Sequence, residues 1–193
     1  MKSDVSRRIS RVCVFCGSSP GARPAYGRAA HEFGNLLGAR GIDLVWGGGN
    51  VGLMGIVADA TLAAGSRAIG VIPKALAERE LGHTRATELH VVRTMHERKA
   101  LMADLSDAFV ALPGGMGTFD ELFEILTWTQ LGFHAEPIGL LDVEGYYAPL
   151  LAFLDGARDE GFVRPGDRAN LPVETDPGRL LDELARERTP LRR

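Results

Sequence analysis

The sequence predicts an α/β protein made of a single doubly wound domain, with a mainly parallel sheet and helices on both faces. Three observations predict this fold. Apolar runs of strand length alternate with helical segments along the 193 residues. The runs are continuous rather than alternating in polarity, as in parallel strands that are buried on both faces. Glycine clusters follow several of the runs, which is typical of tight strand-to-helix turns.

Turn residues set the expected elements in the first half of the chain. Pro24 suits the first turn of a helix, and Gly41 suits the residue that stops it. Residues 74–87 form a polar and irregular segment, and this segment is longer than an ordinary connection between two elements. The expected elements are strand 12–17, helix 24–39, strand 43–46, a helix that ends at residue 64, and strand 67–72.

The second half continues the alternation, so the whole chain is expected to share one sheet. The expected elements are strand 89–92, helix 95–106, strand 108–112, a helix that ends near Gly132, strand 137–142, helix 146–159, strand 171–174 and helix 177–187. Residues 1–10 are predicted to be a flexible N-terminal leader, 11–187 the single doubly wound domain, and 188–193 a C-terminal tail.

The composition is that of an ordinary globular domain. Hydrophobic residues make up 45% and charged residues 24%, with a net charge of −3 and a pI near 6.0. This balance gives no reason to expect nucleic-acid or membrane partners. The N-terminus has no apolar signal segment and no stretch is long enough to cross a membrane, which predicts a cytoplasmic protein.

Two cysteines, Cys13 and Cys16, are spaced like a redox pair. They lie within an expected strand, where side chains three residues apart point to opposite faces. A redox pair would normally begin a helix. The two are therefore expected to be buried small side chains rather than a catalytic couple.

The loop Gly47–Gly52 matches the G-x-G-x-x-G pattern of dinucleotide sites. That pattern expects an acidic residue at the end of the following strand, and this strand ends in Ile72-Pro73-Lys74. A redox dinucleotide is therefore disfavoured. The glycines either serve packing alone or approach a mononucleotide or sugar phosphate, in which case Gly48 and Gly49 are candidate contacts.

Residues 113–121, PGGMGTFDE, join an apolar strand to a helix. Such a turn offers unpaired backbone N–H groups to an anion. It is not a P-loop, because no lysine precedes Thr118, so triphosphate chemistry is disfavoured. Thr118 and Glu121 also have the spacing of a helix capping box, which is a purely structural alternative for Glu121.

A second polar stretch, residues 94–99 (TMHERK), supplies positive charge. Thr94 and Glu97 have capping-box spacing and place Arg98 and Lys99 near a helix start, where cations oppose the helix dipole. The stretch is either a solvated basic turn or a site at which arginine binds a phosphate or a carboxylate.

Anion-binding turns, an arginine and a carboxylate suit cleavage of the N-glycosidic bond of a nucleoside monophosphate. The turns would hold the 5′-phosphate, and the carboxylate would stabilise an oxocarbenium-like sugar and activate water. No Cys, His, Asp or Glu cluster has metal-ligand spacing, and the five histidines are scattered, so no metal is expected.

The 113–121 segment resembles the PGGxGTxxE signature of the LOG ("lonely guy") family, the cytokinin riboside 5′-monophosphate phosphoribohydrolases. The stretches MHERK (95–99), VWGGG (45–49) and WTQLG (128–132) are similar too. The resemblance covers about residues 11–160. It implies hydrolysis of N6-substituted AMP to free base and ribose 5-phosphate, and AMP is expected to be a poorer substrate. It also implies a Rossmann-like fold, a homodimer and no cofactor.

The resemblance implies catalytic roles for Arg98 and Glu121. The implied nucleotide contacts are Glu80, Lys99, Gly114, Gly115, Met116, Gly117, Thr118, Phe119, Asp120 and Thr127. Asp120 stands where the family usually has glutamate, so its fine positioning is expected to differ. Family members have also been labelled lysine decarboxylases, but no lysine here lies in a recognisable pyridoxal-phosphate setting.

Two further expectations remain open. A non-catalytic nucleotide or molybdenum-cofactor carrier is the alternative function, and a carrier has no need of the Glu121 carboxylate. The helix after residue 121 is apolar on more than one face, which favours a second copy of the chain as partner. The apolar residues concerned are Leu122, Phe123, Ile125, Leu126, Trp128 and Leu131.

Overall fold

The computed structural model describes residues 8–78 and 82–186, and it confirms the predicted α/β domain. Seven strands form one sheet in the order β4-β3-β2-β1-β5-β6-β7, and every neighbouring pair is parallel. The strands are β1 (Arg11–Phe15), β2 (Asp43–Trp46), β3 (Ala68–Pro73), β4 (Glu88–Val92), β5 (Ala108–Ala111), β6 (Ile138–Leu141) and β7 (Val173–Glu174).

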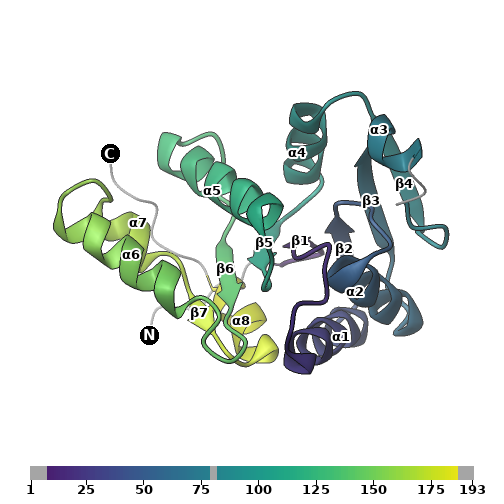
Figure 1. The fold of residues 1–193 in the computed structure, drawn as a ribbon, viewed down its shortest axis with the longest axis horizontal. Helices are drawn as coiled ribbons and strands as arrows, with labels where there is room; N and C mark the ends of the chain where they lie inside the picture. The colour runs from purple at the N-terminus through teal and green to yellow at the C-terminus, as the bar shows by residue number, and fades with distance from the viewer. Residues whose placement is uncertain (1–7, 79–81, 187–193) are drawn as a thin grey trace.

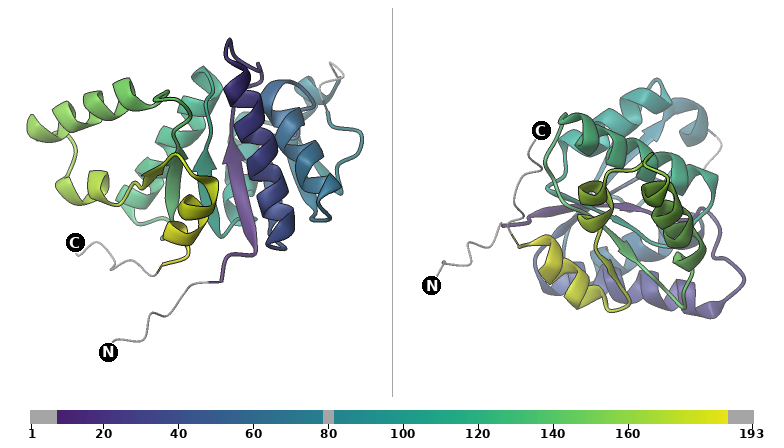
Figure 2. Two further views of the ribbon diagram at one scale, coloured as in Figure 1. Left: turned by 90° about the horizontal axis from the view of Figure 1, so that it is seen from below. Right: turned by 90° about the vertical axis from the view of Figure 1, so that its left-hand side faces the viewer.

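Helices cover both faces of the sheet, and two hydrophobic clusters fill the space beneath them (Figures 1 and 2). One cluster packs α1, α2 and α8 against the sheet, and the other packs α4, α5 and α6 against the opposite face. The helices are α1 (Pro24–Ala39), α2 (Gly52–Ala63), α3 (Lys74–Leu76), α4 (Met95–Asp104), α5 (Met116–Leu131), α6 (Ala148–Asp159), α7 (Pro165–Ala169) and α8 (Pro177–Leu184).

The two cysteines confirm the expected alternation of side chains along β1. Cys13 and the Cys16 that directly follows the strand are both buried and unpaired, and they belong to opposite hydrophobic clusters. Burial raises the pKa of both thiols above the ordinary value, which keeps them protonated and unreactive. They act as small core side chains.

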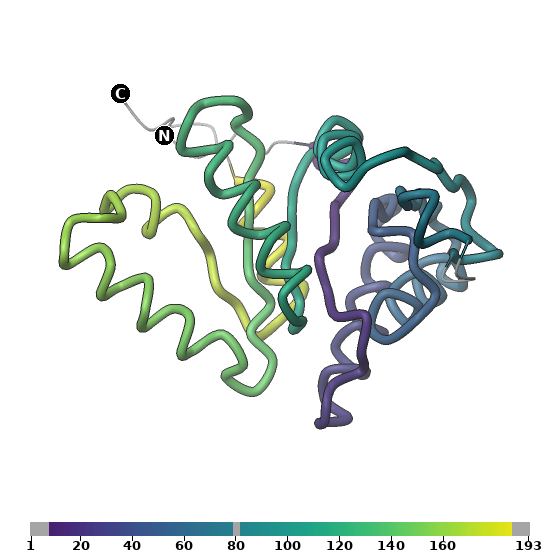
Figure 3. The backbone as a smooth tube through the Cα atoms, turned by 45° about the horizontal axis from the view of Figure 1, so that its top comes forward, coloured from purple at the N-terminus to yellow at the C-terminus, as the bar shows by residue number. Residues whose placement is uncertain are grey.

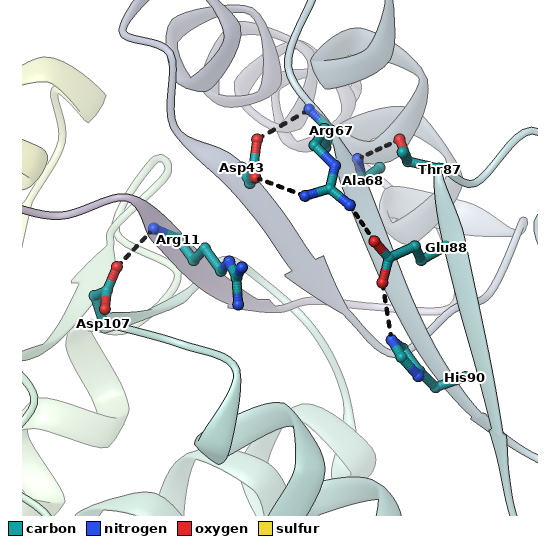
Figure 4. Close-up of polar contacts among 8 residues, drawn as sticks. All are labelled: Arg11, Asp43, Arg67, Ala68, Thr87, Glu88, His90 and Asp107. Atoms are coloured by element: carbon teal, nitrogen blue, oxygen red, sulfur yellow. Dashed lines mark hydrogen bonds and ion pairs between the residues drawn. The ribbon is translucent and has the colours of Figure 1, made fainter.

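Polar contacts connect the amino ends of the strands (Figure 4). The Asp107 carboxylate accepts hydrogen bonds from the backbone N–H groups of Ser10 and Arg11, at 2.8 and 2.9 Å. Asp43 accepts from the Arg67 N–H at 3.1 Å, and the Thr87 hydroxyl accepts from the Ala68 N–H at 3.0 Å. These bonds satisfy backbone N–H groups at the first residues of the strands or just before them, and they hold neighbouring strands in register.

The order of the strands marks the place for a ligand. The chain winds from β1 through β2 and β3 to β4 on one side, and then β5, β6 and β7 lie on the other. Successive connections therefore leave β1 and β5 in opposite directions, so the turns at their carboxyl ends flank a crevice. In the described parts of the chain no helix is long and apolar enough to span a membrane.

Candidate active site

The turn after β5 is tightly held. The Gly17 N–H donates to the Pro113 carbonyl at 3.0 Å, which joins the turns of β1 and β5. A Cβ atom on Gly114 would lie 2.1 Å from the Thr118 hydroxyl and 2.9 Å from the Gly17 nitrogen, so only glycine fits there. Around Gly115 and Gly117, in contrast, a Cβ would meet open space. The turn is fixed on its inner side and open on its outer side.

The capping-box prediction for Thr118 and Glu121 is wrong. Helix α5 begins at Met116, with extended Gly115 as the N-cap residue and no side-chain cap bond. Thr118 is thus the third helical residue and Glu121 the sixth, and the first turn holds no acidic side chain. The two glycines let the chain enter the helix three residues earlier than the threonine signal suggested, with Gly115 rather than Thr118 as the N-cap residue. Glu121 therefore needs another explanation.

The capping box at the start of α4 is confirmed, and it orients Arg98. The Thr94 hydroxyl accepts from the Glu97 N–H at 3.1 Å, and the Glu97 carboxylate accepts from the Arg93 N–H at 2.9 Å. Arg98 lies on the opposite, inner side of the helix and is only 8% exposed. This burial excludes the alternative of a solvated basic turn.

Arg98 and Glu121 form a buried ion pair between α4 and α5. The Arg98 Nη2 and Glu121 Oε1 atoms are 3.0 Å apart, and Glu121 is also 8% exposed. Gly47, at the carboxyl end of β2, makes room for the guanidinium: a Cβ there would lie 1.8 Å from Nη2. Three segments far apart in sequence therefore meet at this pair. Figure 3 traces the chain from α4 through β5 into α5.

Burial raises the pKa of Glu121 to about 7, although Arg98 opposes the shift. The Asp120 and Glu124 carboxylates raise it further, and Lys99 lowers it. A carboxylate with a pKa near neutral can accept a proton during a reaction, and shifts of this kind are concentrated at functional sites.

Lys99 connects the two other acids of α5. Its ammonium lies 3.0 Å from the Asp120 carboxylate and 2.8 Å from that of Glu124, and its side chain is 11% exposed. Burial alone would lower the pKa of Lys99, but these hydrogen bonds offset it and the pKa is raised. Lys99 therefore partly neutralises the negative charge beside Glu121.

A small cavity lies beside Glu121, with a volume of about 10 Å³. It can hold at most one water molecule, which is far too small for a nucleotide. The cavity is lined by Phe15, Lys99, Phe109, Glu121, Glu124, Ile125 and Trp128.

The glycine loop after β2 is anchored from two directions. The Trp46 indole N–H donates to the Gly49 carbonyl at 3.1 Å, and the His83 backbone N–H donates to the Gly48 carbonyl at 2.9 Å. The His83 ring is buried and its Nε2 lies 2.8 Å from the Asp59 carboxylate of α2. Gly48 and Gly49 thus have their carbonyls engaged by the protein, and the loop is held beside Gly47.

The other residues expected to contact the nucleotide differ in their exposure and in their distance from Glu121. Thr127 is exposed, its hydroxyl donates to the Phe123 carbonyl, and it lies six residues beyond Glu121, or about 9 Å along the helix. Met116, the first residue of α5, is 84% exposed, and Phe119 is half-buried. Glu80 lies outside the described residues.

Sequence reasoning missed several residues that support the site. Gly17, Tyr146 and Tyr147 hold the turn after β5, and His83 with Asp59 holds the loop after β2. The two tyrosines lie between β6, which neighbours β5, and α6, and this position was the available signal. Within the described residues no group of three or more His, Cys, Asp or Glu side chains could hold a metal ion.

Comparison with known proteins assigns the family. Residues 54–184 match the family model described as "Possible lysine decarboxylase". A cytokinin riboside 5′-monophosphate phosphoribohydrolase of Arabidopsis thaliana is 54% identical over 181 residues, which cover 94% of this chain and 83% of the relative. The chain belongs to the LOG family. The resemblance to this family is thereby confirmed.

Further LOG-family relatives cover the chain to a similar extent. A probable cytokinin riboside 5′-monophosphate phosphoribohydrolase of Oryza sativa subsp. japonica is 53% identical over 180 residues, 93% of this chain and 74% of the relative. A second Arabidopsis thaliana enzyme of the same name is 52% identical over 165 residues, 86% of this chain and 78% of the relative.

Solved structures with the same fold are more distant. The molybdenum cofactor binding protein of the phototrophic bacterium Rippkaea orientalis aligns with a TM-score of 0.68 at 21% identity, covering 91% of this LOG-family chain and 95% of its own. The Moco carrier protein of Chlamydomonas reinhardtii aligns with a TM-score of 0.66 at 22% identity, covering 89% and 92%. This likeness confirms the Rossmann-like fold.

Proposed function

We propose that this protein hydrolyses the N-glycosidic bond of cytokinin riboside 5′-monophosphates, which are N6-substituted AMP, to free base and ribose 5-phosphate. AMP is a candidate second substrate. The observation that carries the proposal is the buried Arg98–Glu121 pair beside the open glycine turn of α5. The printed names of two relatives, which are 53% and 54% identical over the aligned residues, support the same activity.

In the proposed reaction the bond between the sugar C1′ and the base nitrogen breaks, and both electrons leave with the base. The sugar becomes oxocarbenium-like, and the Glu121 carboxylate stabilises this positive charge. Water then attacks C1′ and gives a proton to Glu121, while the departing base takes up one proton from solvent; Glu121 later releases its proton to solvent, so the atoms and charges balance. The reaction consumes only water and nucleotide.

Arg98 has two roles in this scheme. Its charge opposes the effect of burial on Glu121, so that the carboxylate is ionised near neutral pH. Its position against Gly47 also fixes the carboxylate relative to the turn after β5. The N–H groups of that turn would hold the 5′-phosphate, which places the sugar near Glu121.

A non-catalytic carrier of a nucleotide or of the molybdenum cofactor is the alternative, since proteins of that description share the fold. Fold likeness at this level of identity does not carry function. A carrier needs anion-binding turns, but it has no use for a buried carboxylate whose pKa lies near 7. The acid therefore favours the hydrolase.

We also propose that the protein is a homodimer. Phe123 and Leu131 on α5 are 38% and 57% exposed, and Phe133 just beyond the helix is 73% exposed. Apolar side chains gathered on one helix suit an interface between copies. Light scattering coupled to gel filtration tests this, and a mass of one chain at micromolar concentration would contradict it.

The function is tested by incubating the protein with N6-isopentenyl-AMP, and separately with AMP, and measuring free base and ribose 5-phosphate. Equal amounts of the two products are expected, with faster release from the substituted nucleotide. Intact nucleotide that stays bound without release of base from either compound would support the carrier instead. Arg98→Ala and Glu121→Gln serve as inactive references.

A further inference from the structure

Four consecutive carbonyl groups in the turn after β5 are each engaged by a protein donor. The Leu112 carbonyl accepts from the Tyr147 hydroxyl at 2.6 Å, and the Pro113 carbonyl accepts from the Gly17 N–H at 3.0 Å. The Gly114 carbonyl accepts from the Tyr146 hydroxyl. The Gly115 carbonyl accepts from the Phe119 N–H at 3.0 Å, as the first bond of α5.

This pattern decides which groups the turn can offer to a ligand. A trans peptide unit directs its C=O and N–H to opposite sides. Since Tyr146 draws the Gly114 carbonyl toward the segment after β6, the Gly115 N–H of the same unit points the other way. The Gly115 N–H forms no hydrogen bond within the described parts of the chain. The first N–H groups of α5 are open as well, as at any helix start.

We propose that Tyr146 is a positioning residue: by binding the Gly114 carbonyl, it leaves only N–H donors of this turn facing the substrate phosphate. Tyr147 supports it by binding the Leu112 carbonyl, two residues earlier in the chain. Carbonyl oxygens carry partial negative charge, so a carbonyl free to rotate toward the site would repel an anion. The two hydroxyls remove that possibility at Leu112 and Gly114. The inference rests on the proposed function only in naming the phosphate as that of the nucleotide.

The segment that carries the tyrosines is itself fixed. The Asp142 carboxylate accepts from the Tyr147 N–H at 2.7 Å, and Glu144 adopts a positive φ of 53°. A non-glycine residue in that conformation is strained, and such strain persists only where neighbours hold it. Glu144 pairs with Arg23 at 3.2 Å.

The Tyr146 ring is held on two sides. It meets the edges of Tyr26 and Tyr147, with centroid distances of 5.6 and 5.1 Å and interplanar angles of 76° and 84°. Edge-to-face contacts of this kind fix the orientation of a ring. The hydroxyl is therefore directed at the Gly114 carbonyl before any ligand arrives.

The test compares Tyr146→Phe with Tyr26→Phe, which removes a neighbouring hydroxyl that does not touch the turn. Tyr146→Phe is expected to raise KM for the nucleotide roughly three- to tenfold, the range for one lost hydrogen bond, with kcat within about twofold. Binding of inorganic phosphate, measured by calorimetry, should weaken by the same factor. Tyr26→Phe should match the wild type in both measurements.

Equal KM values and equal phosphate affinities in the two variants would overturn the inference. So would a loss of thermal stability in Tyr146→Phe with unchanged phosphate binding, because that is the signature of a purely structural bond. Tyr147→Phe provides a second variant, expected to lower the melting temperature and to weaken phosphate binding together. Phosphate binding needs no turnover, so a wild-type protein that cleaves nothing would contradict the proposed function but leave this inference standing.

Discussion

Replacing Gly47 by alanine should remove activity while leaving the fold intact. The added Cβ would lie 1.8 Å from the Arg98 Nη2 atom, against at least 3.4 Å for an ordinary contact, so the guanidinium must move by about 1.6 Å. The nearest atoms all belong to the tip of a flexible side chain, so the backbone need not shift. The Arg98–Glu121 distance of 3.0 Å cannot survive such a displacement unchanged.

The expected loss in kcat/KM is about 100-fold, which is what a misplacement of about 1 Å can cost. The assay is release of free base from N6-isopentenyl-AMP, with circular dichroism and melting temperature measured in parallel. Gly156→Ala is the matched control, because its Cβ would meet open space on α6. A folded Gly47→Ala protein that keeps a third or more of wild-type activity would refute the reasoning that Arg98 must occupy this position.

Three further predictions concern the same site. In the wild type, kcat/KM should rise with pH through an apparent pKa of about 7, because Glu121 must be ionised to accept a proton; a profile flat from pH 5 to 8 would contradict this. Lys99→Met should move this rise in kcat/KM to higher pH, because the Lys99 charge lowers the pKa of Glu121. Asp120→Asn should move it to lower pH, because the Asp120 charge raises that pKa. An identical rise in both variants would show that Glu121 is not the titrating group. Gly114→Ala should cost about 1–3 kcal/mol of stability in chemical denaturation, because its Cβ meets the Thr118 hydroxyl and the Gly17 backbone; an unchanged midpoint would contradict the packing described.

The elements of the fold could be predicted from local chemistry. Helix α1 spans Pro24–Ala39 as expected, because proline and Gly41 act at its ends through their own backbone preferences. The short helix α7 (Pro165–Ala169) was missed because it is too brief to show a hydrophobic period, and α4 and α8 end two to three residues earlier than expected. Helix ends fray and depend on packing, which the sequence pattern does not describe.

The site, like the fold, could be predicted from the sequence only in part. The motifs pointed to Arg98 and Glu121, but their contact joins two helices and could not be inferred from spacing. Thr118 misled the prediction of the start of α5, since its signal was outweighed by the freedom of two preceding glycines. Tyr146 and Tyr147 act on a neighbouring strand's turn, so their role depends on the order of strands in the sheet, which only the structure gave.

The most direct test of a hydrolytic centre is a comparison of binding with single-turnover cleavage in Glu121→Gln. The amide keeps the size of the side chain but cannot accept the proton of water. The variant is expected to bind N6-isopentenyl-AMP within about threefold of the wild-type affinity and to release base about 10²–10⁴ times more slowly. Release of base at the wild-type rate by the folded variant would contradict the account.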